Sequence, residues 1–203
     1  MQTTEHPPTQ PIPFWNLPNI LTVLRIVAIP FVAMMLWNVP TPLESIVACI
    51  LFVVAMLTDI LDGYLARKWN LLTPMGAYLD PLADKLMVTT VLIMLIPLGW
   101  APAWLIAVLL CREMTITGLR GIASQQNLVL AASPLGKTKT AYQSTAIGML
   151  LWHNPVNWPI VGKVDVHSCG IVLLYISVLF AVISAVEYFF LYYKAAVKNQ
   201  PST

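Results

Sequence analysis

Apolar residues dominate the chain in six long runs, each separated from the next by a shorter segment richer in polar residues, proline or glycine. The runs cover roughly residues 17–37, 43–67, 81–96, 103–122, 135–152 and 168–193. A helix needs about twenty mainly apolar residues to cross a bilayer. The pattern therefore predicts an all-α, polytopic membrane protein with six transmembrane helices. No internal repeat accompanies the runs, which argues against the inverted-repeat architecture of many transporters.

The same pattern divides the chain into three parts. Residues 1–16 are predicted to form an N-terminal cytoplasmic or interfacial segment, because Phe14 and Trp15 make an apolar cluster suited to the membrane interface. This segment lacks Lys or Arg before its first apolar run, so it does not resemble a signal peptide. Residues 17–194 form the predicted six-helix domain, and residues 195–203 form a cytoplasmic tail.

Composition agrees with a membrane protein. Hydrophobic residues make up 58% of the chain and charged residues only 10%, with a mean hydropathy of +0.75. A net charge of +2 gives no reason to expect binding to nucleic acid. Cys49, Cys111 and Cys169 lie in apolar stretches without paired spacing, so neither a disulfide framework nor a zinc site is predicted.

Lysine and arginine predict the orientation in the membrane. With six spans, both termini share one side with the loops after the second and fourth runs. This side carries Arg67, Lys68, Arg120, Lys137, Lys139, Lys194 and Lys198. The opposite side carries only Lys163. Because positive residues mark the cytoplasmic side, both termini are expected to face the cytoplasm.

Acidic residues concentrate in one stretch, where four of the nine Asp and Glu residues lie between positions 59 and 84. Asp59 and Asp62 are three apart and Asp80 and Asp84 are four apart, spacings that place each pair on one helix face. The short segment between the pairs contains a proline and a glycine, so the helices are expected to turn back and bring the carboxylates together. Unpaired carboxylates repel each other, and two divalent cations would balance four of them. Oxygen ligands favour Mg²⁺, Mn²⁺ or Ca²⁺ over zinc.

Helix capping is the alternative for part of this stretch. Asp80 directly precedes Pro81, and an aspartate N-cap followed by proline is a common helix start. Asp59 and Asp62 would then be solvated residues at a helix end. Capping does not account for all four aspartates together, so metal binding is the favoured interpretation.

Further charges lie within the predicted spans at a comparable depth. Arg25, Lys85, Arg112 and Glu113 each fall inside an apolar run. Charges inside spans usually face an interior or a water-filled cavity, so a shared polar cavity open to the cytoplasm is expected. Such a cavity suits a substrate with a polar head and a lipid tail.

Basic residues on two of the predicted helices suggest a phosphate-binding wall. Arg112, Arg120, Lys137 and Lys139 would together concentrate the donors that a phosphate needs. The alternatives are ion pairs with neighbouring spans for Arg112 and Glu113, and ordinary positive-inside residues for the two lysines. Being adjacent, Arg112 and Glu113 are expected to point in different directions and not to be simply each other's partner.

The aspartate stretch resembles a known family pattern. Asp59-x₂-Asp62-Gly63-x₂-Ala66-Arg67-x₈-Gly76-x₃-Asp80-x₃-Asp84 matches every fixed position of the CDP-alcohol phosphatidyltransferase motif. Three shorter runs resemble the bacterial phosphatidylglycerophosphate synthase branch of that family. They are Asn19-Ile-Leu-Thr22-Val-Leu-Arg25, Arg112-Glu113-Met-Thr-Ile-Thr-Gly-Leu-Arg120, and Gly136-Lys137-Thr138-Lys139-Thr140 followed by Gln143. The part of the chain after Trp152 resembles nothing that assigns a role, and its outer loop at 153–167 stays unassigned.

The resemblance implies an activity. It implies transfer of a phosphatidyl group from CDP-diacylglycerol to an alcohol with release of CMP, the alcohol being sn-glycerol 3-phosphate in the synthase branch. It also implies two divalent cations, Mg²⁺ or Mn²⁺, a homodimer, and a place in the bacterial inner membrane among membrane lipids. Other acceptors (inositol phosphate, serine or phosphatidylglycerol) remain alternatives within the family. A divalent-cation transporter is the alternative outside it, and would require charges spread across the whole bilayer.

The resemblance also implies roles for individual residues. Asp59, Asp62 and Asp80 would be metal ligands, and Asp84 a ligand or the catalytic base. Asp62, with Gly63, Arg67 and Gly76, would hold the cytidine diphosphate. Independently of the resemblance, the wall of Arg112, Arg120, Lys137 and Lys139 would bind the acceptor phosphate. The expected remaining cavity residues are Asn19, Thr22, Arg25, Lys85 and Glu113.

Overall fold

The computed structural model describes residues 16–69, 73–126, 128, 134–158 and 162–198 of the chain. Within these ranges the chain forms six helices and one short hairpin, so the predicted helix number is confirmed there. The helices are α1 (Leu17–Met35), α2 (Pro42–Lys68), α3 (Pro74–Leu95), α4 (Ala103–Gln125), α5 (Pro134–Trp152) and α6 (Val166–Lys198). The hairpin pairs β1 (Val156–Trp158) with β2 (Gly162–Val164) in antiparallel register.

Three helices in the described ranges are long and apolar enough to cross a membrane, not the six that were predicted. They are α1 over Leu17–Met35, α2 over Pro42–Tyr64 and α6 over Val166–Val197. The other three fail on composition rather than length, since α3, α4 and α5 have 22, 23 and 19 residues. These helices carry most of the charged and small polar residues of the candidate site, which lowers their hydropathy.

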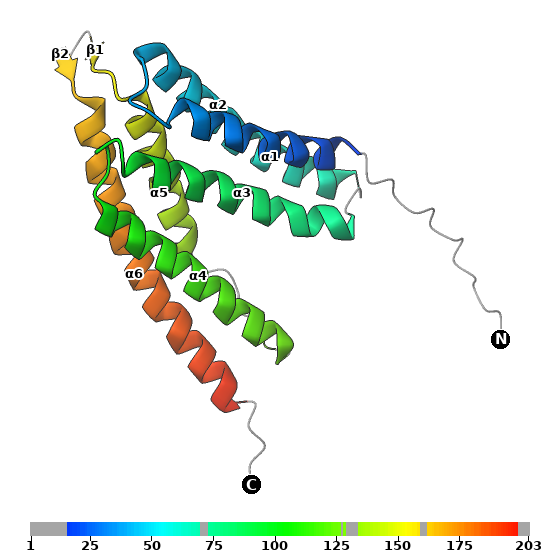
Figure 1. Ribbon diagram of the computed structural model, residues 1–203. Helices are drawn as coiled ribbons and strands as arrows, with labels where there is room; N and C mark the ends of the chain where they lie inside the picture. Colours follow the sequence, from blue (N-terminus) through cyan, green and yellow to red (C-terminus); the bar gives the residue numbers. More distant parts are fainter. Residues whose placement is uncertain (1–15, 70–72, 127, 129–133, 159–161, 199–203) are drawn as a thin grey trace.

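The helices form two groups that diverge from the hairpin end (Figure 1). In the first group α1 packs against both α2 and α3, and in the second α6 packs against α5 and α4. Packing of α2 against α5 joins the groups. At the opposite end, where α1 begins and α6 ends, the groups spread apart (Figure 1).

The apolar core fills the half of the molecule near the hairpin. Its fully buried members come from all six helices and include Val32, Phe52, Met87, Leu105 and Ile147. In lipid, helices associate through close packing because apolar burial alone gains little. Glycine allows one such approach: a Cβ atom at Gly170 of α6 would lie 3.2 Å from the backbone nitrogen of Leu150 in α5.

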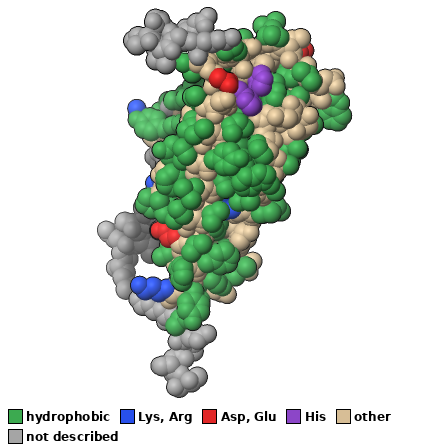
Figure 2. Space-filling model, turned by 90° about the vertical axis from the view of Figure 1, so that its left-hand side faces the viewer, with side chains coloured by type: hydrophobic (Ala, Val, Ile, Leu, Met, Phe, Trp, Pro, Cys, Tyr) green, Lys and Arg blue, Asp and Glu red, His purple; other side chains and the backbone are tan. Residues whose placement is uncertain are grey.

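Hydrophobic side chains also cover much of the outer surface (Figure 2). On α6 the exposed examples include Leu179, Val182 and Phe190, of which Phe190 is 70% exposed. Exposed apolar surface of this extent is expected for a helix that faces lipid.

The start of α3 differs from the prediction. The helix begins at Pro74, and the side chain of Thr73 caps it by accepting a hydrogen bond from the backbone N–H of Gly76 at 3.0 Å. Asp80 and Pro81 therefore lie inside the helix, so Asp80 is not its N-cap and the predicted start at residue 81 is wrong. Thr73-Pro74 provides the same cap-and-proline signal earlier in the chain.

The hairpin end is held by aromatic and polar contacts that the apolar pattern did not predict. The ring of His153 stacks on Trp100 with centroids 4.0 Å apart, and His167 meets His153 edge-on at 4.7 Å. The Asp165 carboxylate caps α6 by accepting from the backbone N–H groups of His167 and Ser168 at 3.1 and 3.4 Å. It also accepts from the Ser168 hydroxyl at 2.6 Å, and this bond lowers the pKa of the carboxyl. These contacts join the end of α5 to the start of α6.

Candidate active site

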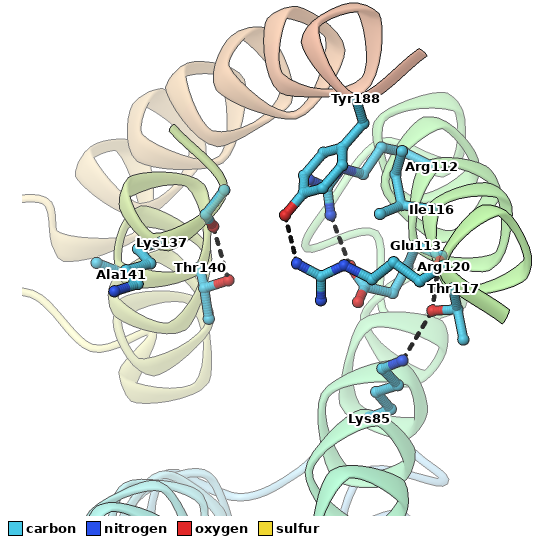
Figure 3. A pocket seen from close by; sticks show the side chains of 11 residues that line it. Lys85, Arg112, Glu113, Ile116, Thr117, Arg120, Lys137, Thr140, Ala141 and Tyr188 are labelled. Atoms are coloured by element: carbon cyan, nitrogen blue, oxygen red, sulfur yellow. Dashed lines mark hydrogen bonds and ion pairs between the residues drawn. The ribbon is translucent and has the colours of Figure 1, made fainter. Parts of the chain in front are cut away.

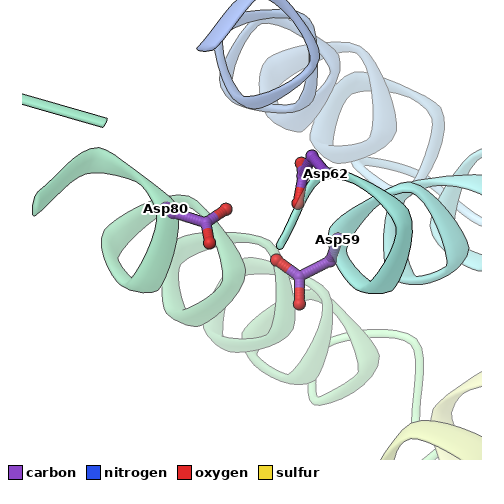
Figure 4. A group of neighbouring side chains, drawn as sticks. All are labelled: Asp59, Asp62 and Asp80. Atoms are coloured by element: carbon purple, nitrogen blue, oxygen red, sulfur yellow. The ribbon is translucent and has the colours of Figure 1, made fainter. Parts of the chain in front are cut away.

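Three aspartates from two helices form a compact cluster. Asp59 and Asp62 lie on α2 and Asp80 lies on α3, and one carboxylate oxygen from each lies within 4.8 Å of the others (Figure 4). The Asp62 side chain is 2% exposed, whereas those of Asp59 and Asp80 are 31% and 36% exposed. Helical spacing places Asp59 and Asp62 together on α2, and packing of α3 beside α2 brings Asp80 to them, with one open side. Asp84 does not belong to this group and lines a separate small cavity of about 40 Å³.

One buried arginine from α1 contacts all three carboxylates. Arg25 donates to Asp59 Oδ1 and Asp62 Oδ2 at 2.8 Å each, and to Asp80 Oδ1 at 3.3 Å. Its Nε also donates to the backbone carbonyl of Ala55 at 3.2 Å, which fixes the plane of the guanidinium. Arg25 is 2% exposed, so it forms the floor of the cluster.

The donor set fits a divalent cation. Arg25 uses one oxygen of each carboxylate, and the buried Oδ1 of Asp62 has no hydrogen-bond partner among the described residues. One guanidinium offsets one of the three negative charges. Carboxylate oxygens are the ligands that Mg²⁺ and Mn²⁺ prefer. The cluster therefore has both the unpaired oxygen and the excess negative charge that a hard cation requires.

Residues at the start of α1 lock α1 to α3 beside the cluster. The side chain of Asn19 donates to the Thr73 hydroxyl at 2.9 Å, and both surround Gly76. A Cβ atom at position 76 would collide with the Asn19 side chain and lie 2.9 Å from Thr73 Oγ1. Gly76 is thus required for packing. The Thr22 hydroxyl donates to the carbonyl of Pro18 at 3.2 Å, within its own helix.

Two residues predicted to bind the nucleotide, Gly63 and Arg67, lie on α2. Gly63 follows Asp62 directly on α2, next to the cluster. Arg67 lies on the last turn of the same helix, and its side chain falls outside the described part of the structure.

Apart from the aspartate cluster, a positively charged cavity of about 440 Å³ lies between α3, α4, α5 and α6 (Figure 3). Four basic side chains and one acidic side chain face it. Its lining includes Lys85, Arg112, Glu113, Arg120, Lys137 and Tyr188. We call it the basic pocket. Arg112 and Arg120 share this pocket because they are eight residues apart on one helix, as predicted.

The cations of the basic pocket are mostly held by neutral groups. Lys85 donates to Thr117 Oγ1 at 2.7 Å. Arg112 donates to Ser184 Oγ at 2.8 Å and to Glu113 at 3.3 Å. Glu113 also pairs with Lys139 at 3.0 Å, so the two adjacent residues contact each other without being simply each other's partner, as expected. Their long side chains can bend toward each other although their Cβ atoms point apart.

Lys139 does not lie in the basic pocket. It is 3% exposed and donates to Glu113 Oε2 at 3.0 Å. It lines the smaller cavity, of about 40 Å³, together with Asp84 and Gln143. Lys137 and Lys139 are two residues apart on a helix and therefore point in different directions, so the predicted wall of four basic residues divides between two cavities.

The structure adds two functional candidates that the sequence analysis missed, Ser184 and Tyr188 of α6. Ser184 is fully buried and Tyr188 is 2% exposed. Arg120 donates to the Tyr188 hydroxyl, and its guanidinium carbon lies 5.0 Å from the centre of the tyrosine ring. A sequence signal exists: polar residues four apart on an otherwise apolar helix mark one face.

Comparison with known proteins agrees with this geometry. The model of the CDP-alcohol phosphatidyltransferase family matches residues 15–186. A Bacillus subtilis (strain 168) protein named CDP-diacylglycerol–glycerol-3-phosphate 3-phosphatidyltransferase is 40% identical over 86% of this chain and 94% of the relative. A Rickettsia bellii (strain RML369-C) protein of the same name is 36% identical over 86% and 93%. With the aspartate cluster in place and a family match over most of its length, the chain belongs to the CDP-alcohol phosphatidyltransferases and is a transferase.

Proposed function

We propose that this protein transfers the phosphatidyl group of CDP-diacylglycerol to sn-glycerol 3-phosphate, giving phosphatidylglycerophosphate and CMP. The observation that carries the proposal is the presence of two sites of opposite charge connected through α3. Asp80 belongs to the aspartate cluster, Asp84 lines the small cavity, and Lys85 lines the basic pocket. The names of the relatives specify the same two substrates.

The aspartate cluster is the proposed donor site. Asp59, Asp62 and Asp80, with Asp84 nearby, would hold two Mg²⁺ or Mn²⁺ ions, which neutralise charge on a diphosphate and on the departing CMP. Arg25 keeps the carboxylates close together. Gly63, Arg67 and Gly76 are proposed to line the cytidine diphosphate site with Asp62.

The basic pocket is the proposed acceptor site. Arg112, Arg120 and Lys137 would bind the phosphate of glycerol 3-phosphate through charge-assisted hydrogen bonds. Asp84 is the proposed base for the acceptor hydroxyl, because a carboxylate beside the donor site can take up its proton. Glu113 and Lys139 pair between the small cavity and the basic pocket and would keep both walls in place.

An apolar groove beside the basic pocket supports a lipid substrate. It lies between α3 and α4, has a volume of about 510 Å³, and shares Lys85, Glu113 and Thr117 with the basic pocket. Ile93, Leu110 and Met114 supply its apolar lining. We propose that a lipid tail enters here.

The proposal includes a place in the membrane. The three long apolar helices α1, α2 and α6 would cross the bacterial inner membrane, and α1, at 19 residues, would span about 28 Å. The excess of Lys and Arg near the termini favours a cytoplasmic location for both termini and the site. Among the described residues, the buried charged ones (Arg25, Asp62 and Lys139) lie away from the hairpin end, which disfavours a cation transporter. A homodimer remains an expectation from the family.

Release of CMP tests this function. The purified protein would be given CDP-diacylglycerol and, separately, glycerol 3-phosphate, inositol phosphate, serine or phosphatidylglycerol. We expect CMP release with glycerol 3-phosphate, and its loss in excess chelator with recovery on adding Mg²⁺ or Mn²⁺. Turnover with another acceptor alone would reassign the substrate, and full turnover in chelator would contradict the metal assignment.

A further inference from the structure

We propose that Ser184 and Tyr188 of α6 are positioning residues that hold the Arg112 and Arg120 guanidinium groups in place for the acceptor phosphate. This inference rests on the proposed function, because it assigns α6 a task in acceptor binding. It adds a helix to the site in the part of the chain where no motif was found.

Tyr188 fixes Arg120 in two ways. Its hydroxyl accepts a hydrogen bond from Arg120 Nη2, and its ring lies against the guanidinium, with the ring centre 5.0 Å from Arg120 Cζ. Tyr188 itself is 2% exposed and packs with Ile116 and Leu119 of α4. A rigid, buried side chain thus directs a long, exposed one toward the basic pocket.

Ser184 fixes Arg112 in a similar way. Its hydroxyl accepts from Arg112 Nη2 at 2.8 Å and donates to the carbonyl of Ala181 at 3.0 Å, so its orientation is set from both sides. Glu113 binds the other terminal nitrogen of Arg112 at 3.3 Å. Ser184 is fully buried and cannot reach a ligand in the pocket itself.

Ser184 and Tyr188, which we call the anchors of the two arginines, are uncharged, and their neutrality affects ligand binding. A carboxylate in place of Ser184 or Tyr188 would neutralise the arginine that it holds. A hydroxyl orients the guanidinium and leaves its positive charge for the ligand. Arginine has many rotamers, and ordering it before the ligand arrives removes that entropy cost from binding. Loss of an anchor should therefore weaken acceptor binding without changing the donor site.

The Tyr188→Phe variant is the first test, because it removes the hydroxyl and keeps the ring. We expect the KM for glycerol 3-phosphate to rise about five-fold, since hydrogen bonds to charged groups are among the stronger ones. The KM for CDP-diacylglycerol and kcat should stay unchanged. Tyr193→Phe is the matched control, because Tyr193 lies on the same helix and is 70% exposed.

Ser184→Ala is the second test, with Ser177→Ala as its matched control. Both serines are fully buried on α6 and bind a carbonyl of their own helix, but Ser184 also accepts from Arg112. We expect Ser184→Ala to raise the acceptor KM about ten-fold, because it leaves a guanidinium N–H without this partner. Ser177→Ala should leave that KM unchanged.

A double-mutant cycle separates positioning from general destabilisation. In an Arg120→Ala background the additional Tyr188→Phe change should have no further effect on the acceptor KM, because the group it positions is gone. Equal acceptor KM values for Tyr188→Phe, Ser184→Ala and their controls would overturn the inference, as would fully additive effects in the cycle. Absence of CMP release from the unaltered protein would instead overturn the proposed function.

Discussion

The aspartate cluster and the basic pocket hold like charges together by different means. In the cluster, three carboxylates surround one buried opposite charge, Arg25, which contacts all of them. In the basic pocket, four cations face one carboxylate, Glu113, and the hydroxyls of Thr117, Ser184 and Tyr188 provide most other contacts.

The comparison shows how each region keeps an unneutralised charge for its ligand. Full pairing of every charge would satisfy the protein and leave nothing to attract a substrate. The cluster keeps a surplus of negative charge suited to cations, and the pocket keeps a surplus of positive charge suited to a phosphate. Unneutralised charges are costly within a membrane. Buried partner side chains therefore hold the charged groups of both regions in place.

Removing one charge from the aspartate cluster should have the largest effect. Asp59→Asn and Asp80→Asn keep the side-chain volume but remove a proposed metal ligand. Turnover should fall by about 10³-fold or more, given the several kcal/mol that a bound metal ion contributes. Asp165→Asn at the hairpin end is the control, because asparagine also caps helices and turnover should persist. Near-normal CMP release by both cluster variants would refute the metal assignment.

Removing the counter-charge should destabilise the cluster. Arg25→Gln leaves three carboxylates without their shared partner, and breaking a buried ion pair typically costs about 3–5 kcal/mol. With chelator present, the thermal midpoint of Arg25→Gln in detergent should be lower than that of the unaltered protein. Adding Mg²⁺ should raise the midpoint of the variant by more than it raises that of the unaltered protein.

Arg25→Lys is the matched variant for this test. It keeps the charge but cannot contact three carboxylates in one plane, so its midpoint should lie between the other two. If Arg25→Gln had the same midpoint as the unaltered protein in chelator, Arg25 would not be the floor of the cluster.

Removing one cation from the basic pocket should have a smaller and more selective effect. Lys137→Ala or Arg112→Ala should raise the KM for glycerol 3-phosphate about ten-fold, since a charge-assisted contact is worth about 1.5–3 kcal/mol. The KM for CDP-diacylglycerol should change little. Lys194→Ala is the control, because Lys194 is exposed near the end of α6. A rise confined to the CDP-diacylglycerol KM would move these residues to the donor site.

The smallest expected effect is on stability, and it comes from changing glycines that pack differently in the two regions. Gly76→Ala should destabilise the protein by about 1–3 kcal/mol, because the new methyl group overlaps the Asn19 side chain beside the cluster. Gly118→Ala on α4 meets nothing within 4 Å and should be neutral or stabilise by about 0.5–1 kcal/mol. Thermal midpoints of the two variants would decide, and equal midpoints would contradict the role given to Gly76.

The sequence by itself determined the features that depend on local spacing. Apolar runs predicted six helices, and the three-residue spacing of Asp59 and Asp62 placed both carboxylates on one helix face. Arg112 and Arg120 were placed on one face by the same periodicity. These predictions held because helical periodicity is a local property that neighbouring elements do not change.

Tertiary structure decided which of these faces meet. It placed Arg25 beneath three aspartates, separated Lys139 from Lys137, and left Asp84 outside the cluster. It also made Ser184 and Tyr188 part of the basic pocket, although a serine and a tyrosine on an apolar helix predict little by themselves. Contacts of this kind join residues as far apart as 34 to 72 positions, such as Arg25 with Asp59 and Arg112 with Ser184. They depend on how helices pack, and helix periodicity alone carries no information about the partner that each face will meet.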